Sequence, residues 1–192
     1  MKAIDSIMFV LALLVSHSLF AKDLTLYDRV ESRLKHDSEL AKAIGHPAKE
    51  MSSVAWMIGT WDIDTRVDAQ PGKAVEKGTS HVTPVLGGVW LEVRDTYPQG
   101  NQDISYLGFN PVTRRWVTMT VDGVGNAVTN TAARWDGAKL SFVGDVIVLG
   151  ERATLKQTVT KISDRAYIVT NEERMRDGRW QLLDTYRYTK RP

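Results

Sequence analysis

The sequence predicts a mostly β protein: an antiparallel, up-and-down, calycin-like β-barrel of about ten strands, preceded by one or two N-terminal helices. Three observations support this fold class. After Gly59, helical periodicity stops and apolar residues alternate with polar ones. Turn signals then recur at the short intervals that an antiparallel meander requires. No helical pattern separates the strands, so the sheet can remove its exposed edges by closing on itself.

The composition of the chain argues against several functional classes. The chain has 192 residues without Cys, and its 25 basic and 23 acidic residues leave a net charge of +2. This length suits a single core that needs no disulfide. No block of Lys and Arg alternates with aromatic residues, which argues against nucleic-acid binding. The four His are scattered and there is no Gly-x-Ser-x-Gly motif, so we expect neither a zinc site nor an activated nucleophile.

Residues 1–21 have the features of a secretory signal peptide. Lys2 supplies the positive end, residues 7–15 form the apolar core, and small residues precede a cleavage site after Ala21. The apolar run is too short for a permanent membrane anchor. The sequence therefore predicts a periplasmic or secreted protein that is not an integral membrane protein. Its mature chain would hold a helical segment over residues 22–57 and a barrel domain over residues 58–192.

The helical segment begins with an expected helix over residues 25–44, where Thr25 and Asp28 match a capping box. Its single apolar stripe suits packing on its own domain. The alternative is that the stripe binds a partner or a second copy of the chain as a homodimer. Gly45 ends this helix, and a short second helix is expected over residues 47–57.

The barrel begins at Gly59, which permits a sharp turn into the first strand. Trp61, Ile63 and Thr65 share one face of this strand, and charged residues occupy the other. We expect strands at residues 60–68, 74–85, 89–97, 103–109, 115–122, 126–135, 138–143, 146–162, 165–175 and 179–189. A turn at Gly144-Asp145 separates the seventh from the eighth.

Aromatic residues are the content most suggestive of function. The predicted strands carry Trp61, Trp90, Tyr106, Trp116, Trp135, Trp180, Tyr186 and Tyr188. A barrel of eight or more strands can hold one small ligand, and aromatic rings either line such a pocket or fill it. The leading hypothesis is a barrel that binds a small apolar or amphipathic molecule without enzymatic activity. Trp61, Trp90 and Tyr106 are the expected aromatic contacts.

The orientation of one strand decides which ligand is favoured. If Glu92 and Arg94 face inward with Trp90, they would orient a charged head group. If Leu91 and Val93 face inward instead, the interior is apolar or filled. Two other functions are possible: an enzyme that uses Glu92, Arg94 or His81, or a solid barrel that serves as a structural or interaction protein.

No cofactor is expected. Haem is the group most worth weighing for a barrel of this kind, and it needs an axial ligand. No His follows His81 in the chain, which argues against haem bound through histidine. Tyr186 or Tyr188 would be the alternative ligands.

Several short motifs, taken in order, resemble a known family. They are Ile58-Gly59-Thr60-Trp61, Gly87-Gly88-Val89-Trp90-Leu91-Glu92-Val93-Arg94, Gly108-Phe109-Asn110-Pro111-Val112-Thr113-Arg114-Arg115-Trp116-Val117, Glu172-Glu173-Arg174 and Tyr186-Arg187-Tyr188. With them, residues 53–189 resemble the bacterial domain-of-unknown-function family 1579, a group of calycin-like barrels. The resemblance implies the fold but brings no established activity and no catalytic residues.

The predicted signal peptide can be tested directly. We expect the mature protein, purified from its own host, to begin at Lys22, because cleavage should follow the small residues that end at Ala21. N-terminal sequencing of the exported fraction checks this. A full-length chain recovered from the cytoplasm would contradict it.

Overall fold

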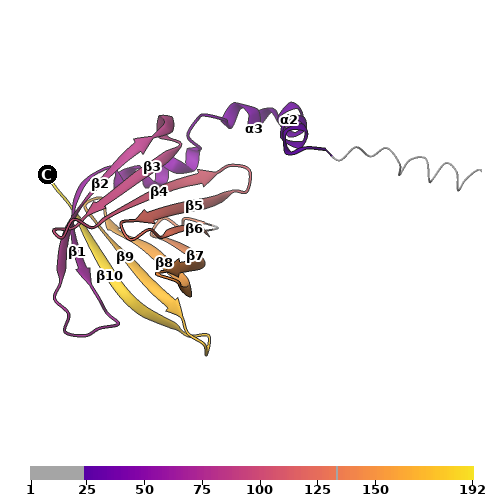
Figure 1. The fold of residues 1–192 in the computed structure, drawn as a ribbon. Coiled ribbons are helices and arrows are strands. Elements are labelled where there is room, and N and C mark those ends of the chain that lie inside the picture. The colour runs from indigo at the N-terminus through magenta and orange to yellow at the C-terminus, as the bar shows by residue number, and fades with distance from the viewer. Residues whose placement is uncertain (1–23, 133) are drawn as a thin grey trace, which may run out of the picture. The chain divides into compact units, whose positions relative to one another are not determined.

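A computed structural model describes residues 24–132 and 134–192, and it confirms the predicted barrel. Ten antiparallel strands form one closed sheet in which each strand pairs with its neighbours in sequence, and β1 pairs with β10 (Figure 1). The strands are β1 (Gly59–Arg66), β2 (Glu76–Val85), β3 (Trp90–Thr96), β4 (Gln102–Asn110), β5 (Arg115–Asp122), β6 (Ala127–Ala132), β7 (Lys139–Val148), β8 (Glu151–Ser163), β9 (Ala166–Arg174) and β10 (Trp180–Lys190). The predicted signal peptide lies outside the described residues.

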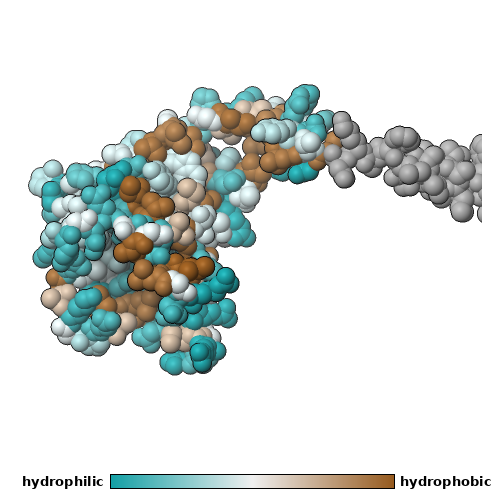
Figure 2. All heavy atoms as spheres, in the orientation of Figure 1, coloured by the Kyte–Doolittle hydropathy of each residue, from teal (hydrophilic) through white to brown (hydrophobic). Residues whose placement is uncertain are grey.

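The described residues divide into two compact units, one that ends at Lys42 and one that runs from Ala43 to Pro192. Within the described part of the chain, no helix is both long and apolar enough to cross a bilayer. Figure 2 shows that hydrophilic side chains cover much of the visible outer surface of the barrel. Apolar side chains are also exposed, among them Val121, Val124, Ile147 and Leu149.

The first helical stretch differs from the single helix predicted over residues 25–44. It consists of α2 (Leu26–His36) and α3 (Ser38–Ala43), separated at Asp37. The predicted capping box of Thr25 and Asp28 is confirmed. Asp37 ends α2 with non-helical backbone angles, and its side chain then accepts a hydrogen bond from the Leu40 amide at 2.9 Å. Asp favours such a capping position over a helix interior, which explains the break.

A 3₁₀ helix, η1 (Lys49–Met57), contributes to the core of the barrel unit. Met51, Val54 and Met57 are its buried residues. The predicted turn at Gly59 is also present, with φ at +137°. Glycine is needed there for its backbone angle, whereas the nearest neighbour of a Cβ would be the flexible end of the Lys190 side chain at 2.8 Å.

The alternation predicted for the first strand is confirmed. Trp61, Ile63 and Thr65 are buried, and Asp62 between them is exposed. The Trp61 ring lies edge-on to Tyr167 with centroids 4.8 Å apart, and its Nε1 donates a hydrogen bond to the Met57 carbonyl at 2.8 Å. Trp61 therefore ties η1 to the barrel wall through both packing and a hydrogen bond.

Two sequence predictions around β6 and β7 are wrong. Trp135 lies outside the strands, where its ring packs 6.3 Å from that of Trp56. The turn expected at Gly144 is absent, and β7 continues to a turn at Leu149-Gly150, where φ is +50° and +88°. Gly144 is a glycine for a different reason: a Cβ at this position would overlap the side-chain amide of Asn130 on the neighbouring strand.

Trp61 should be a sensitive position of the core. Trp61→Ala should lower the free energy of unfolding by about 3–5 kcal/mol, because it removes a fully buried ring and its hydrogen bond. Trp61→Phe, which keeps most of the apolar volume, should lose less. Urea denaturation measures both, with Val124→Ala at an exposed site as the control, expected within about 0.5 kcal/mol of wild type. A wild-type midpoint for Trp61→Ala would show that the ring is not an anchor.

Candidate functional site

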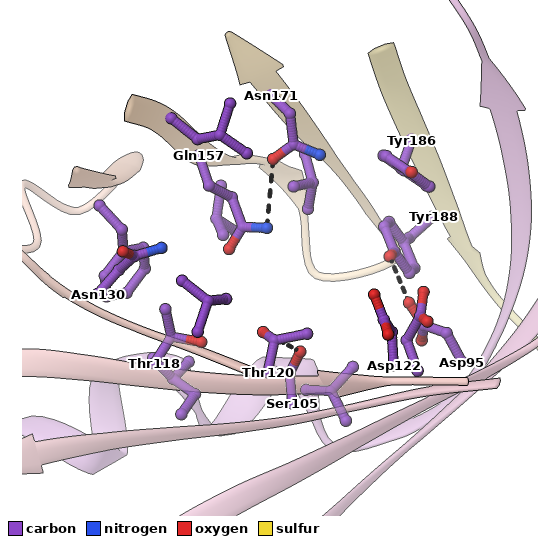
Figure 3. A pocket seen from close by; sticks show the side chains of 18 of the residues that line it. Asp95, Ser105, Thr118, Thr120, Asp122, Asn130, Gln157, Asn171, Tyr186 and Tyr188 are labelled. Carbon is purple, nitrogen blue, oxygen red and sulfur yellow. Dashed lines mark hydrogen bonds between the residues drawn. The ribbon is translucent and has the colours of Figure 1, made fainter. Parts of the chain in front are cut away.

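The barrel interior contains a partly open cavity of about 290 Å³, and Figure 3 shows many of the side chains around it. Because side chains alternate along a strand, about every second residue of each strand faces this interior. Part of the lining is apolar and includes Met57, Val93, Leu107, Val128, Phe142, Val146, Leu155, Val159 and Val169. Pockets for small ligands start at about this size and combine an apolar wall with a few placed polar groups.

Three aspartates from neighbouring strands also line the cavity. Asp95 on β3 is the cross-strand partner of Asp103 on β4, and Asp103 is the partner of Asp122 on β5. Like charges directly opposite each other destabilise a sheet, so packing alone would not favour this arrangement. Within the part of the chain that the structure describes, no Lys, Arg or His lines the cavity to neutralise them.

Asp95 is the most deeply buried of the three, with only 9% of its surface exposed. Its Oδ2 accepts a hydrogen bond from the Tyr188 hydroxyl at 2.8 Å, while its Oδ1 is buried without a protein partner. Burial raises the pKa of Asp95 to about 6, against the smaller opposing effects of the Ser80 hydroxyl on the neighbouring strand and of hydrogen bonding from Tyr188. The carboxylate therefore stays ionised at neutral pH at a cost to stability.

Asp103 and Asp122 differ from Asp95 in their surroundings. Burial, and then the charge of Asp122, raise the pKa of Asp103. Burial also opposes ionisation of Asp122, but hydrogen bonds from Asn126, Val124 and Gly125 outweigh it and hold its pKa below the usual value. Asp122 thus closes the hairpin between β5 and β6 while adding a fixed negative charge. Among the described residues, no three potential ligands are grouped so that they could hold a metal ion.

Further polar groups continue around the wall. The hydroxyls of Ser105 and Thr120 lie 2.8 Å apart, and Gln157 donates to Asn171 at 3.3 Å. Asn171 in turn donates to Asp184 at 2.8 Å, and burial raises the pKa of Asp184 to about 6. On the far side of the cavity in Figure 3, Asn130 has a buried Oδ1 with no hydrogen-bond partner.

The residues that the sequence singled out as ligand contacts lie elsewhere. Trp61 is buried in the core but does not line the cavity. The other four lie on the outer face of β3 and β4. Arg94 pairs with Glu92 at 3.0 Å, and the Tyr106 hydroxyl donates to the same carboxylate at 3.1 Å. Trp90 covers Gly108, where a Cβ would meet its ring at 2.5 Å.

Of the two orientations considered for β3, the structure has the one in which Leu91 and Val93 face inward. His81 is likewise exposed, with its ring 3.2 Å from the Thr60 hydroxyl. Glu92, Arg94 and His81 therefore lie outside the cavity, and ligand binding or catalysis by this outer group stays a prediction.

The sequence contained a signal for the aspartates that was missed. The inward face of β3 continues from Leu91 and Val93 to Asp95, so a carboxylate follows directly on an apolar run. On β4, Asp103 shares the inward face with Ser105 and buried Leu107. An acidic residue that continues the apolar face of a strand is expected to be buried. Buried carboxylates are uncommon unless they are paired or functional.

The burial of Asp95 predicts a pH dependence. A folded pKa of about 6, above the ordinary 3.8, means that its contribution to stability is complete below about pH 4 and lost as pH rises through about 6. This shift corresponds to about 3 kcal/mol. Asp95→Asn, which cannot ionise, should therefore gain stability relative to wild type by an amount of that order between about pH 4 and pH 8. Urea denaturation across this range tests it, and a constant difference would contradict it.

No curated protein matches the chain. Matching solved structures include a redesigned β-barrel, b11L5F_LGL, at 13% identity and a TM-score of 0.34, covering 73% of this chain and 96% of that one. Another is the redesigned β-barrel mFAP1, bound to DFHBI, at 15% identity and a TM-score of 0.37, covering 72% and 98%. Similarity this low supports no inference about function.

The family comparison is more informative. The family described as "Protein of unknown function (DUF1579)" matches residues 46–190. This range includes η1 and all ten strands, so it covers the whole barrel and its cavity. The resemblance found from the short sequence motifs is thereby confirmed, and the chain belongs to the DUF1579 family.

Proposed function

We propose that this barrel binds a small amphipathic molecule in its interior. The observation that carries the proposal is the cavity of about 290 Å³, whose lining combines an apolar surface with polar side chains. An amphipathic guest would place its apolar part against residues such as Phe142 and Val159, and its polar part against the carboxylates and amides. This combination is typical of sites for small molecules.

A solid barrel would be built differently. Protein cores are packed at the density of organic crystals, and most of their buried polar atoms have hydrogen-bond partners. Here the interior keeps a cavity, and Asp95 and Asn130 each have a buried oxygen without a protein partner. Both features disfavour a barrel whose interior is only structural, and they support one that receives a guest.

Binding is also better supported than catalysis. Glu92, Arg94 and His81, which the enzyme hypothesis would use, lie on the outer face of the barrel. The carboxylates of the cavity have no His, Lys or Cys beside them among the described lining residues. A general acid and base with distinct roles would require such differentiated partners.

Two further parts of the proposal concern the N-terminal part of the chain. Export to the periplasm or the medium is supported by the signal-peptide pattern of residues 1–21. A homodimer through the N-terminal helix is supported by the apolar side chains of α2, because none of its residues is buried and Leu26, Tyr27 and Val30 are exposed.

Binding can be tested with a neutral amphiphile. We expect 1-octanol to give saturable heat with the wild-type protein in titration calorimetry. Thr118→Trp, which fills the cavity from β5, should weaken that binding by about tenfold or more, because the guest loses its buried contacts. Met119→Trp is the matched control, since the adjacent residue is exposed on the opposite face of the strand and should leave binding unchanged.

The same experiment can overturn the proposal. If the folded wild-type protein shows no saturable binding, or if both tryptophan variants bind equally well, the cavity does not receive this class of molecule.

A further inference from the structure

The charges around the cavity are all of one sign. Asp95, Asp103 and Asp122 lie in one row across three adjacent strands, and the described lining residues include no cation. A second hollow of about 180 Å³ shares Asp103, Asp122 and two tyrosines with the cavity, and adds Glu76. The field at this end of the cavity therefore repels anions and attracts cations.

Asp95 supplies an independent sign of a missing partner. Its carboxylate is nine-tenths buried and lines the cavity, and its Oδ1 has no hydrogen-bond partner in the protein. Leaving a buried carboxylate oxygen unpaired is unfavourable, and a donor from a guest would remove that cost. Figure 3 shows Tyr188 and Asp122 on the same side of the cavity as Asp95.

Tyrosine rings complete this end of the site. Tyr97, Tyr186 and Tyr188 line the cavity together with the aspartates, and Tyr97 and Tyr186 also line the adjoining hollow. The face of an aromatic ring attracts cations, and rings combined with carboxylates are a recurrent way of binding ammonium groups. A metal ion is a poorer fit, because the described residues contain no group of three or more potential ligands placed around one point.

We propose that the aspartate end of the cavity binds the positively charged head of the amphipathic guest, a protonated amine or a quaternary ammonium. This rests on the proposed function and specifies the ligand class at the same site. Asp95 pairs with the head through its free oxygen, Asp103 adds a second charge, and the tyrosine rings contact its sides. The apolar tail lies against apolar lining residues such as Phe142 and Val159.

Three probes with the same tail and different heads test the proposal: octylammonium, 1-octanol and octanoate. In titration calorimetry at neutral pH, octylammonium should bind about 10- to 100-fold more tightly than 1-octanol, as expected for a hydrogen bond to a charged group. Octanoate should bind more weakly than 1-octanol, because its carboxylate meets charges of the same sign.

Variants assign the effect to the cavity. Asp95→Asn should weaken octylammonium binding by about tenfold or more while changing 1-octanol binding by less than about twofold. Asp145→Asn is the matched control, since it removes the same charge from an exposed position on the outside of β7 and should leave all three affinities unchanged. Asp103→Asn provides a second test if Asp95→Asn does not fold.

Distinct results separate this inference from the proposed function. If octylammonium and 1-octanol bind equally well, or if the preference for the amine survives in both Asp95→Asn and Asp103→Asn, the cation site is wrong while binding in the cavity stands. If no probe gives saturable binding to the folded protein, the proposed function itself fails.

Discussion

The pairing of β1 with β10 is the constraint on which the rest of the structure depends. It closes the sheet, so alternate residues of every strand are committed to an interior that they must fill or shape. One row of cross-strand partners, with one residue from each of β1 to β5, shows the result. All its members face inward: Trp61, Ser80, Asp95, Asp103 and Asp122. The same closure that packs an aromatic ring in the core therefore brings three carboxylates together.

Local patterns predicted the elements well where a local rule decides the structure. The capping box at Thr25, the turn at Gly59 and the alternation around Trp61 follow from neighbouring residues alone. Local patterns failed where a residue distant in sequence determines the structure. Gly144 resembles a turn residue in the sequence, but it lies within β7 and faces Asn130 of the neighbouring strand. The resemblance to the family could also be predicted from the sequence, because its motifs are short and local.

The candidate site could not be predicted to the same extent. Its residues come from many strands, and which of them meet depends on register, which no single strand encodes. Glu92 and Arg94 were candidate ligand contacts because they form a charged pair, but they lie on the outer face of β3. Asp95, the next residue after Arg94, faces inward. A shift of one residue thus separates a surface ion pair from a buried charge.

The contact between Gly144 and Asn130 also limits how this protein can evolve. The buried amide of Asn130 occupies the space that any side chain at position 144 would need. A side chain at position 144 would force the buried Asn130 side chain to move, so replacing the glycine should cost less after position 130 has become smaller. Because Asn130 lines the cavity, the shape of the cavity wall would change with the pair, so the two positions are coupled through the interior of the barrel.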